Sequence, residues 1–321
     1  MIEEIFDKIK KSKRCLLLTH HNADIDAISS CVALFELTGR KHDIGVPSSI
    51  SRGAQDIAED YNIKREPELS QYDTLVIVDC ASRQQLRPLN LEDFNGIIIL
   101  IDHHEPGDIY KMAEMSVVKK DAISTAEIIY EAAVKLDCGI NKNAAKNIIC
   151  GIVSDSAHLR LADSKHFLHI SKLLDIAEIN YNGVLQLLRT PTTRSEKIAR
   201  IKALKRMECY KLNDLILVFS EIGSFEASVA RSLLKSGADI AVVASERKSE
   251  LRISARCKKD VSKKIHLVND IFKPIEKDID GSVGGHISAA SSNGKNKDYK
   301  KIFEKMLVKF ENKLGVKSKK L

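Results

Sequence analysis

Side chains of the types that can bind metal ions follow three apolar runs of the chain, at the point where each run ends. The runs cover residues 16–18, 75–78 and 96–101, and their leucine and β-branched content predicts buried strands. The polar residues that follow these runs, together with Asp155 after a fourth apolar segment, are His20, Asp24, Asp26, Asp79, Asp102, His103 and His104. Since open α/β sheets bind ligands at the carboxyl ends of their strands, we expect these side chains to converge there.

Metal binding is the chemistry that this set of side chains favours. The four carboxylates expected to bind metal are costly to bury unpaired, and no matching cluster of Lys or Arg accompanies them in the sequence. They belong to Asp24, Asp26, Asp79 and Asp155. Two divalent cations would neutralise them. Carboxylates mixed with imidazoles and no thiolate suit Mn²⁺, with Mg²⁺ or Co²⁺ as alternatives. Taken singly, Asp26 could instead cap the helix that follows it, Asp79 could be a loop residue, and His103 or His104 could be a hydrogen-bonded core histidine.

The elements that must position these residues alternate between strand and helix up to about residue 155. Strands are predicted at 15–19, 42–46, 73–79, 96–101 and 115–119, and helices at 26–38, 53–61 and 124–137. This alternation predicts an α/β fold with a doubly wound parallel sheet. After a helical stretch, strands at 215–219, 240–244 and 251–257 and helices at 225–236, 261–273 and 298–313 predict a second, smaller α/β domain. We expect a catalytic domain at 1–178, a helical linker at 179–208 and a substrate-binding domain at 209–321, with a cleft between the two domains.

Composition narrows the class of protein. The chain has 321 residues, 44% hydrophobic and 30% charged, which predicts a globular protein of two domains. No apolar run approaches the roughly 18 residues of a membrane span, and the first residues predict an amphipathic helix, not a signal peptide. Seven scattered cysteines without a Cys-x-x-Cys motif predict reduced thiols in a cytoplasmic protein. The net charge of +7 permits a polyanionic partner, and we expect Lys317, Lys319 and Lys320 to form a solvated tail.

Five motifs, in order, resemble those of the DHH phosphoesterase superfamily. The first four are His20-x-Asn22-x-Asp24-x-Asp26, Asp79, Asp102-His103-His104 and Asp155, and the fifth, Gly284-Gly285-His286-x-x-Ala289-Ala290, resembles the GGHxxAA signature of the associated C-terminal domain. The resemblance covers nearly the whole chain and is to compact two-domain members, the NrnA-type oligoribonucleases and RecJ-like archaeal nucleases. The common Asn-Pro-Asp-Gly-Asp is Asn-Ala-Asp-Ile-Asp here, and the common Thr-Asp-Thr is Ser-Asp-Ser. Neither change removes a ligand.

The resemblance implies a role for each motif residue. One metal ion would be held by His20, Asp24 and Asp79, and the other by Asp26, Asp79, His103 and Asp155, so that Asp79 bridges the two. His104 would contact the scissile phosphate or the leaving group, and Asp102 would fix an imidazole. Two ions about 3.5–4 Å apart would activate a shared water for in-line attack on phosphorus.

Substrate selection is expected from the second domain. Gly284 and Gly285 would let the backbone approach a phosphate, and His286 would add a donor, although a Gly-Gly-His sequence alone is also typical of a tight turn. Arg252 and Arg256 lie four apart on a predicted strand, hence on one face, and would bind a terminal phosphate or stack on a base. They could instead be exposed strand charges. Arg160 could reach the scissile phosphate.

These expectations predict an exonuclease that degrades short single-stranded RNA or DNA to nucleoside 5′-monophosphates, and that could also remove the 3′-phosphate of adenosine 3′,5′-bisphosphate. Aromatic residues are 5% of the chain and tryptophan is absent, which argues against a long stacking channel and favours short oligonucleotides. The alternatives are a phosphodiesterase of linear or cyclic dinucleotides, an inorganic pyrophosphatase, or a non-catalytic replication or repair scaffold. A homodimer and a replication or repair protein partner are left open.

Overall fold

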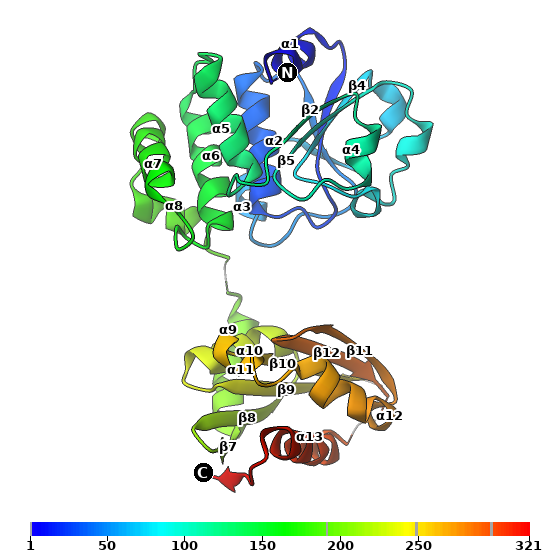
Figure 1. Ribbon diagram of the computed structural model, residues 1–321, viewed down its shortest axis with the longest axis vertical. Helices are drawn as coiled ribbons and strands as arrows, with labels where there is room; N and C mark the ends of the chain where they lie inside the picture. The colour runs from blue at the N-terminus through cyan, green and yellow to red at the C-terminus, as the bar shows by residue number, and fades with distance from the viewer. Residues whose placement is uncertain (1, 191, 248–249, 296–297) are drawn as a thin grey trace. The chain divides into compact units, whose positions relative to one another are not determined.

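The computed structural model describes residues 2–190, 192–247, 250–295 and 298–321. The chain divides into two compact units, Met1–Pro191 and Thr192–Leu321 (Figure 1). The segment 179–208, predicted as a linker, is shared between them: α8 (Tyr181–Leu187) belongs to the first unit and α9 (Arg194–Arg206) to the second. Within the described residues, no helix is long and apolar enough to cross a membrane.

The first unit is built on a six-stranded sheet in the order β3-β2-β1-β4-β5-β6, and every pairing is parallel. This confirms the predicted fold class. The strands are β1 (Cys15–Leu18), β2 (Asp43–Val46), β3 (Ile63–Arg65), β4 (Thr74–Val78), β5 (Ile97–Asp102) and β6 (Met115–Val118). The edge strand β3 is short and polar, and the sequence pattern did not predict it.

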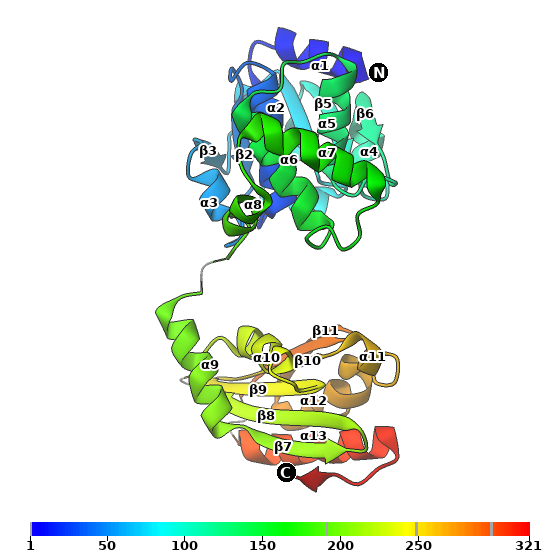
Figure 2. The ribbon, with the colours of Figure 1, turned by 90° about the vertical axis from the view of Figure 1, so that its left-hand side faces the viewer.

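The central strands of this sheet are buried on both faces. Along β1, Cys15 and Leu17 join a core formed with the helices, whereas Leu16 and Leu18 join a second core on the opposite face. The helices α2, α5 and α6 pack against one another over the first core (Figure 2). The helices of the unit are α1 (Ile2–Lys11), α2 (Ile25–Leu37), α3 (Gln55–Ala58), α4 (Asp108–Met112), α5 (Thr125–Lys135), α6 (Lys142–Asp155), α7 (Ser164–Ala177) and α8.

The strand order reverses between β1 and β4. From β1 the chain continues to β2 and β3 on one side, then returns to β4 and continues to β5 and β6 on the other. Open α/β sheets bind their ligands at the carboxyl ends of the strands beside such a reversal, because the connecting segments diverge there and leave a crevice. The segments that follow β1 and β4 therefore lie where a site is expected.

The second unit is a mixed seven-stranded sheet in the order β11-β12-β10-β9-β8-β7-β13, in which only β8 and β9 are parallel among the described pairings. One face packs on α9 and α10, and the other on α13 and the segments before it. Its elements are β7 (Glu208–Leu212), β8 (Leu215–Ile222), α10 (Glu226–Lys235), β9 (Ile240–Arg247), β10 (Glu250–Cys257), α11 (Lys259–Ser262), α12 (Glu276–Ile279), β11 (Gly281–His286), β12 (Ala289–Gly294), α13 (Tyr299–Leu314) and β13 (Lys319–Lys320).

One helix prediction and one alternative for this unit were wrong. The helix predicted at 261–273 is broken into α11 and a π-helical segment, Leu267–Phe272. The alternative that the Gly-Gly-His segment forms a tight turn was wrong, because the segment lies in β11 and pairs antiparallel with β12. Lys317, Lys319 and Lys320 of the basic tail are exposed, as predicted, while β13 within the tail pairs with β7 and the ammonium of Lys320 lies 2.7 Å from a carboxylate oxygen of Glu208.

Candidate metal centre

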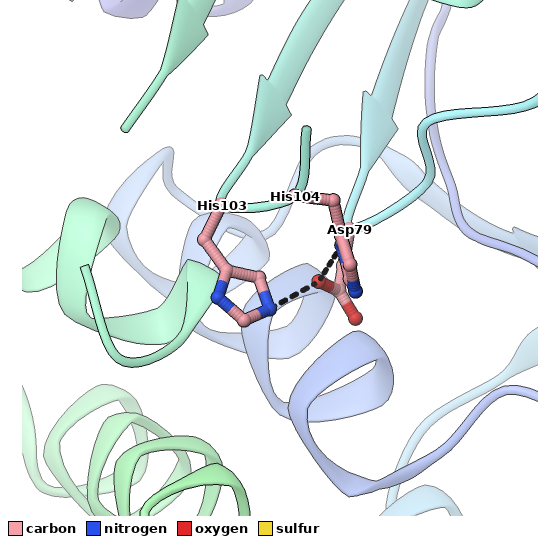
Figure 3. Close-up of side chains that lie close together, drawn as sticks. All are labelled: Asp79, His103 and His104. Carbon is pink, nitrogen blue, oxygen red and sulfur yellow. Dashed lines mark ion pairs between the residues drawn. The ribbon is translucent and has the colours of Figure 1, made fainter. Parts of the chain in front are cut away.

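Asp79 lies at the middle of the predicted site, directly after β4. Its side chain is buried, and its backbone has φ +57°, a left-handed conformation that non-glycine residues adopt mainly at turns and functional sites. Its Oδ1 is 3.6 Å from His103 Nε2 and 3.6 Å from His104 Nδ1 (Figure 3), and its Oδ2 is 3.9 Å from His20 Nε2. Residues after β1, β4 and β5 thus meet at one carboxylate.

Asp26 is held by the amino end of α5. Its Oδ2 accepts a 2.7 Å hydrogen bond from the backbone N–H of Thr125, and its Oδ1 accepts one of 3.1 Å from the N–H of Ala126. These donors have no partner inside α5, and the positive end of the helix dipole favours a carboxylate there. The alternative that Asp26 caps the helix after it was wrong, because Asp24 is the N-cap of α2 and accepts from Ala27 N–H at 3.1 Å.

Two groups of three side chains could each hold a cation, since within each group one ligand atom per residue lies within 4.8 Å of the others. The first is His20, Asp24 and Asp79, and the second is Asp26, His103 and Asp155. His103 Nε2 is 3.7 Å from Asp155 Oδ2 and 3.6 Å from Asp79 Oδ1, so the two groups adjoin. A third group, Asp79, His103 and His104, overlaps both. The structure thus brings all six predicted metal ligands together.

The electrostatics of the site fit bound cations. Burial raises the pKa of Asp79, and the charge of Asp24 raises it further. Burial, then Asp79 and Asp155, raise the pKa of Asp26, and burial with Asp24 and Asp79 raises the pKa of Asp155 to about 7. Each shift records like charges held together in a region of low dielectric. His103 Nε2 is buried and has no hydrogen-bond partner among the described residues, so its lone pair is available to a cation.

His104 is oriented by Asp102. A carboxylate oxygen of Asp102 lies 2.8 Å from His104 Nδ1 and accepts a 3.1 Å hydrogen bond from the His104 backbone N–H. The hydrogen bond with Asp102, supplemented by the charges of Asp79 and Asp155, raises the pKa of His104 to about 9. With Nδ1 engaged, the ring presents Nε2 to a ligand. Asp102 is therefore placed to fix an imidazole, while the contact of His104 with substrate stays a prediction.

The predicted substrate residues are more scattered. Arg160 is exposed in the turn after α6, and no hydrogen bond or ion pair joins it to another described residue. In the second unit, Arg252 and Arg256 lie on β10, where Arg252 is 3.3 Å from Glu250 and Arg256 donates to the carbonyl of Ala255 at 2.8 Å.

Gly284, Gly285 and His286 are exposed on β11, which β12 separates from β10. Gly285 has φ +131°, and a Cβ there would lie 2.2 Å from the carbonyl oxygen of Ala289. This glycine is therefore explained by the close pairing of β11 with β12, whereas Gly284 faces open space.

Two residues that sequence reasoning missed support the centre. Thr125 Oγ1 donates a 2.8 Å hydrogen bond to Asp79 Oδ1, in addition to its backbone bond to Asp26. Gly151 lies inside α6, where a Cβ would come within 2.5 Å of both Asp26 Oδ1 and Ala126 Cβ. An isolated glycine within an otherwise apolar helix was the available signal, since such a residue costs about 1 kcal/mol relative to alanine and usually has a packing reason.

The first unit is a parallel sheet with carboxylates and imidazoles where the strand order reverses, and a mixed-sheet unit follows it. This is the fold of DHH-superfamily phosphoesterases. The family model described as DHH family, N-terminal domain, matches residues 14–152. An uncharacterized protein of Methanocaldococcus jannaschii is 38% identical over 95% of this chain and 94% of its own length. The chain belongs to the DHH family.

Solved structures share the fold at low sequence identity. An exopolyphosphatase-related protein from Bacteroides fragilis superposes with a TM-score of 0.67 and 17% identity, over 98% of this chain and 97% of that one. RecJ from Thermus thermophilus, solved in complex with Mn²⁺, gives a TM-score of 0.50 and 14% identity, over 98% of this chain and 54% of RecJ. At these identities the likeness concerns the fold alone.

Proposed function

We propose that this protein is a Mn²⁺-dependent phosphodiesterase that hydrolyses short single-stranded RNA or DNA to nucleoside 5′-monophosphates. The observation that carries the proposal is the pair of adjoining ligand groups around Asp79, with a buried imidazole nitrogen of His103 left without a hydrogen-bond partner among the described residues. The carboxylate and imidazole donors suit Mn²⁺, the ion described in RecJ.

In this proposal each residue of the centre has a defined task. His20, Asp24 and Asp79 hold one ion, and Asp26, Asp79, His103 and Asp155 hold the other. When bound, the ions lower the pKa of a water and stabilise the charge that builds on the phosphate. Thr125 fixes two of the carboxylates through its hydrogen bonds to Asp26 and Asp79. Asp102 orients His104, which donates a proton or hydrogen bond to the leaving oxygen.

Asp79→Asn tests the proposal with little disturbance of the fold. Asparagine tolerates the left-handed backbone of residue 79 and keeps an oxygen that accepts from Thr125, but it removes the charge that both ions need. The matched control is Asp137→Asn, the same substitution at an exposed aspartate with φ +49°. We expect Asp79→Asn to lose nearly all turnover and Asp137→Asn to keep it.

The assay uses end-labelled RNA and DNA from dimers to decamers with Mn²⁺, and adenosine 3′,5′-bisphosphate as a further substrate. Release of nucleoside 5′-monophosphates from oligomers supports the proposal. Activity confined to dinucleotides would assign the site to a dinucleotide phosphodiesterase instead. Wild-type turnover by Asp79→Asn, or no hydrolysis of any oligomer by the wild-type protein, would overturn the proposal.

A further inference from the structure

Four of the 16 aromatic residues of the chain gather around one cavity of the second unit. The cavity has a volume of about 420 Å³ and is lined mainly by residues of β7, β8 and the start of α13. Figures 1 and 2 label these three elements. The aromatic lining of the cavity consists of Tyr210, Phe219, Tyr299 and Phe303. This volume is within the range of small-molecule sites.

The rings form a continuous apolar wall that is anchored in the core. The centroids of Phe219 and Phe303 are 4.7 Å apart at an interplanar angle of 36°, and Tyr299 meets Phe303 edge-on at 5.6 Å. Phe219 is buried, whereas Tyr210, Tyr299 and Phe303 are half-buried. Rings held by the core on one side and open on the other offer a rigid surface on which a planar ligand can stack.

The charged side chains that line the cavity are of both signs: Arg206 and Lys300 together with Glu208, Glu221 and Glu304. Two of its carboxylates are already paired, Glu221 with Arg206 at 2.8 Å and Glu208 with Lys320 at 2.7 Å. Lys300 lines the cavity and makes no ion pair with a described carboxylate. On a larger scale, Thr192–Leu321 contains 29 Lys and Arg against 16 Asp and Glu, a net charge of +13, whereas Met1–Pro191 contains 22 against 28, a net charge of −6.

The cavity is separate from the glycine-rich strand that was predicted to bind substrate. β7 and β11 are five strand-to-strand steps apart in the sheet, about 24 Å at the usual spacing of roughly 4.8 Å. A ligand that contacts both must therefore be several nucleotides long, and a dinucleotide is too short to do so.

We propose that the cavity between β7, β8 and α13 binds a base of single-stranded nucleic acid, as a second contact for oligomers longer than the reaction itself requires. Tyr299 and Phe303 stack on the base, and Lys300 contacts a neighbouring phosphate. Glu304, which also lines the cavity, offers an acceptor to an exocyclic amino group, as in cytosine. The inference rests on the proposed function only for its choice of substrate class.

This site is tested by measuring how tightly the protein binds single strands under conditions in which it cannot hydrolyse them. Anisotropy of a labelled 12-mer of deoxycytidine is measured with the full chain in EDTA, beside an abasic 12-mer with the same phosphates. We expect Tyr299→Ala to weaken binding of the deoxycytidine 12-mer at least about fivefold, the lower end for loss of one stacked base. Tyr299→Phe, which keeps the ring, should bind within twofold of wild type. The abasic strand should bind more weakly and show no difference between these variants.

The charge is tested by Lys300→Ala, which should lower the slope of log affinity against log salt by about 0.7, the value for one phosphate contact on a single strand. Lys235→Ala, at an exposed lysine of α10, is the control and should leave the slope unchanged. Wild-type affinity in Tyr299→Ala, or an abasic strand that binds as tightly as the deoxycytidine 12-mer, would overturn the inference.

The two proposals fail separately. If the wild-type protein hydrolyses none of the oligomers, the proposed function fails. The binding measurements in EDTA still show whether the cavity binds a base.

Discussion

Gly151→Ala should separate the stability of α6 from the function of the metal centre. Alanine in place of glycine inside a helix normally stabilises it by about 1 kcal/mol. At this position the added Cβ would lie 2.5 Å from Asp26 Oδ1 and 2.5 Å from Ala126 Cβ, too close for either neighbour to stay in place. Either α6 moves away from α5, or the carboxylate of Asp26 moves away from its ligand position.

The expected changes in stability and in Mn²⁺ affinity follow from these opposing effects. Overpacking of a core contact costs about 1–3 kcal/mol, which offsets the gain in helix propensity and leaves a net loss in the free energy of unfolding of roughly 0–2 kcal/mol. Rotation of Asp26 would also give up its hydrogen bonds from Thr125 and Ala126, each worth about 1.5–3 kcal/mol with a charged acceptor. A small displacement of the carboxylate is therefore favoured, and it should weaken Mn²⁺ binding about 10- to 100-fold.

Urea denaturation and Mn²⁺ titration calorimetry on the same preparations measure both quantities. Gly139→Ala is the matched control, because a Cβ there meets nothing within 4 Å. The control should change the free energy of unfolding by less than about 0.5 kcal/mol and leave Mn²⁺ affinity unchanged. A gain of about 1 kcal/mol in Gly151→Ala with wild-type Mn²⁺ affinity would refute the reasoning, since the helix would then have accepted the methyl group without moving the ligand.

Two further predictions concern ions and protons. Mn²⁺ at about 100 times its dissociation constant should add about 2.7 kcal/mol to the free energy of unfolding of the first unit. The measurement is a higher melting temperature that EDTA reverses. An identical melting curve with and without the ion would contradict this prediction. Burial disfavours ionisation of Asp239, but hydrogen bonds from Lys258 and from the backbone N–H of Ile216 outweigh it and hold its pKa below the usual value. Because the folded pKa is the lower one, this stabilisation is present above about pH 4 and is lost as the pH falls through the folded pKa. Asp239→Asn should therefore destabilise the protein at pH 7 and cease to do so in acid, and a pH-independent difference in urea midpoints would refute this.

The parallel sheet and the ligand set were predictable because both depend on local patterns. Each run of leucine and β-branched residues is long enough to indicate a buried strand, and the ligands after β1, β4 and β5 follow their strands closely. β3 is an edge strand of three residues, two of them charged, so it carries no such pattern. β11 was missed because glycine favours turns in sequence, whereas here a Cβ at Gly285 would collide with the backbone of β12.

The supporting residues were not predictable, because their roles arise from tertiary packing. Thr125 meets Asp26 and Asp79 only after α5 has packed beside α2 and the sheet, and these partners are distant in sequence. Gly151 is explained only by the approach of α6 to Asp26. The aromatic cavity likewise combines β7, β8 and α13, and composition does not show that four of the 16 aromatic residues meet there.

The order of strands has a consequence for how the first unit is synthesised. β1 pairs with β4, so Cys15 lies beside Thr74, and Asp155 arrives only with the end of α6. Contacts between such distant parts of a chain form late in folding. The long loop between them must close first, and this closure costs entropy before any contact can stabilise the chain. A nascent chain that has emerged only as far as β5 already carries His20, Asp24, Asp26 and Asp79 but not Asp155. Under the proposed function, such a chain would carry only the first ligand group complete, so binding of the second ion would report that the unit is fully synthesised and folded.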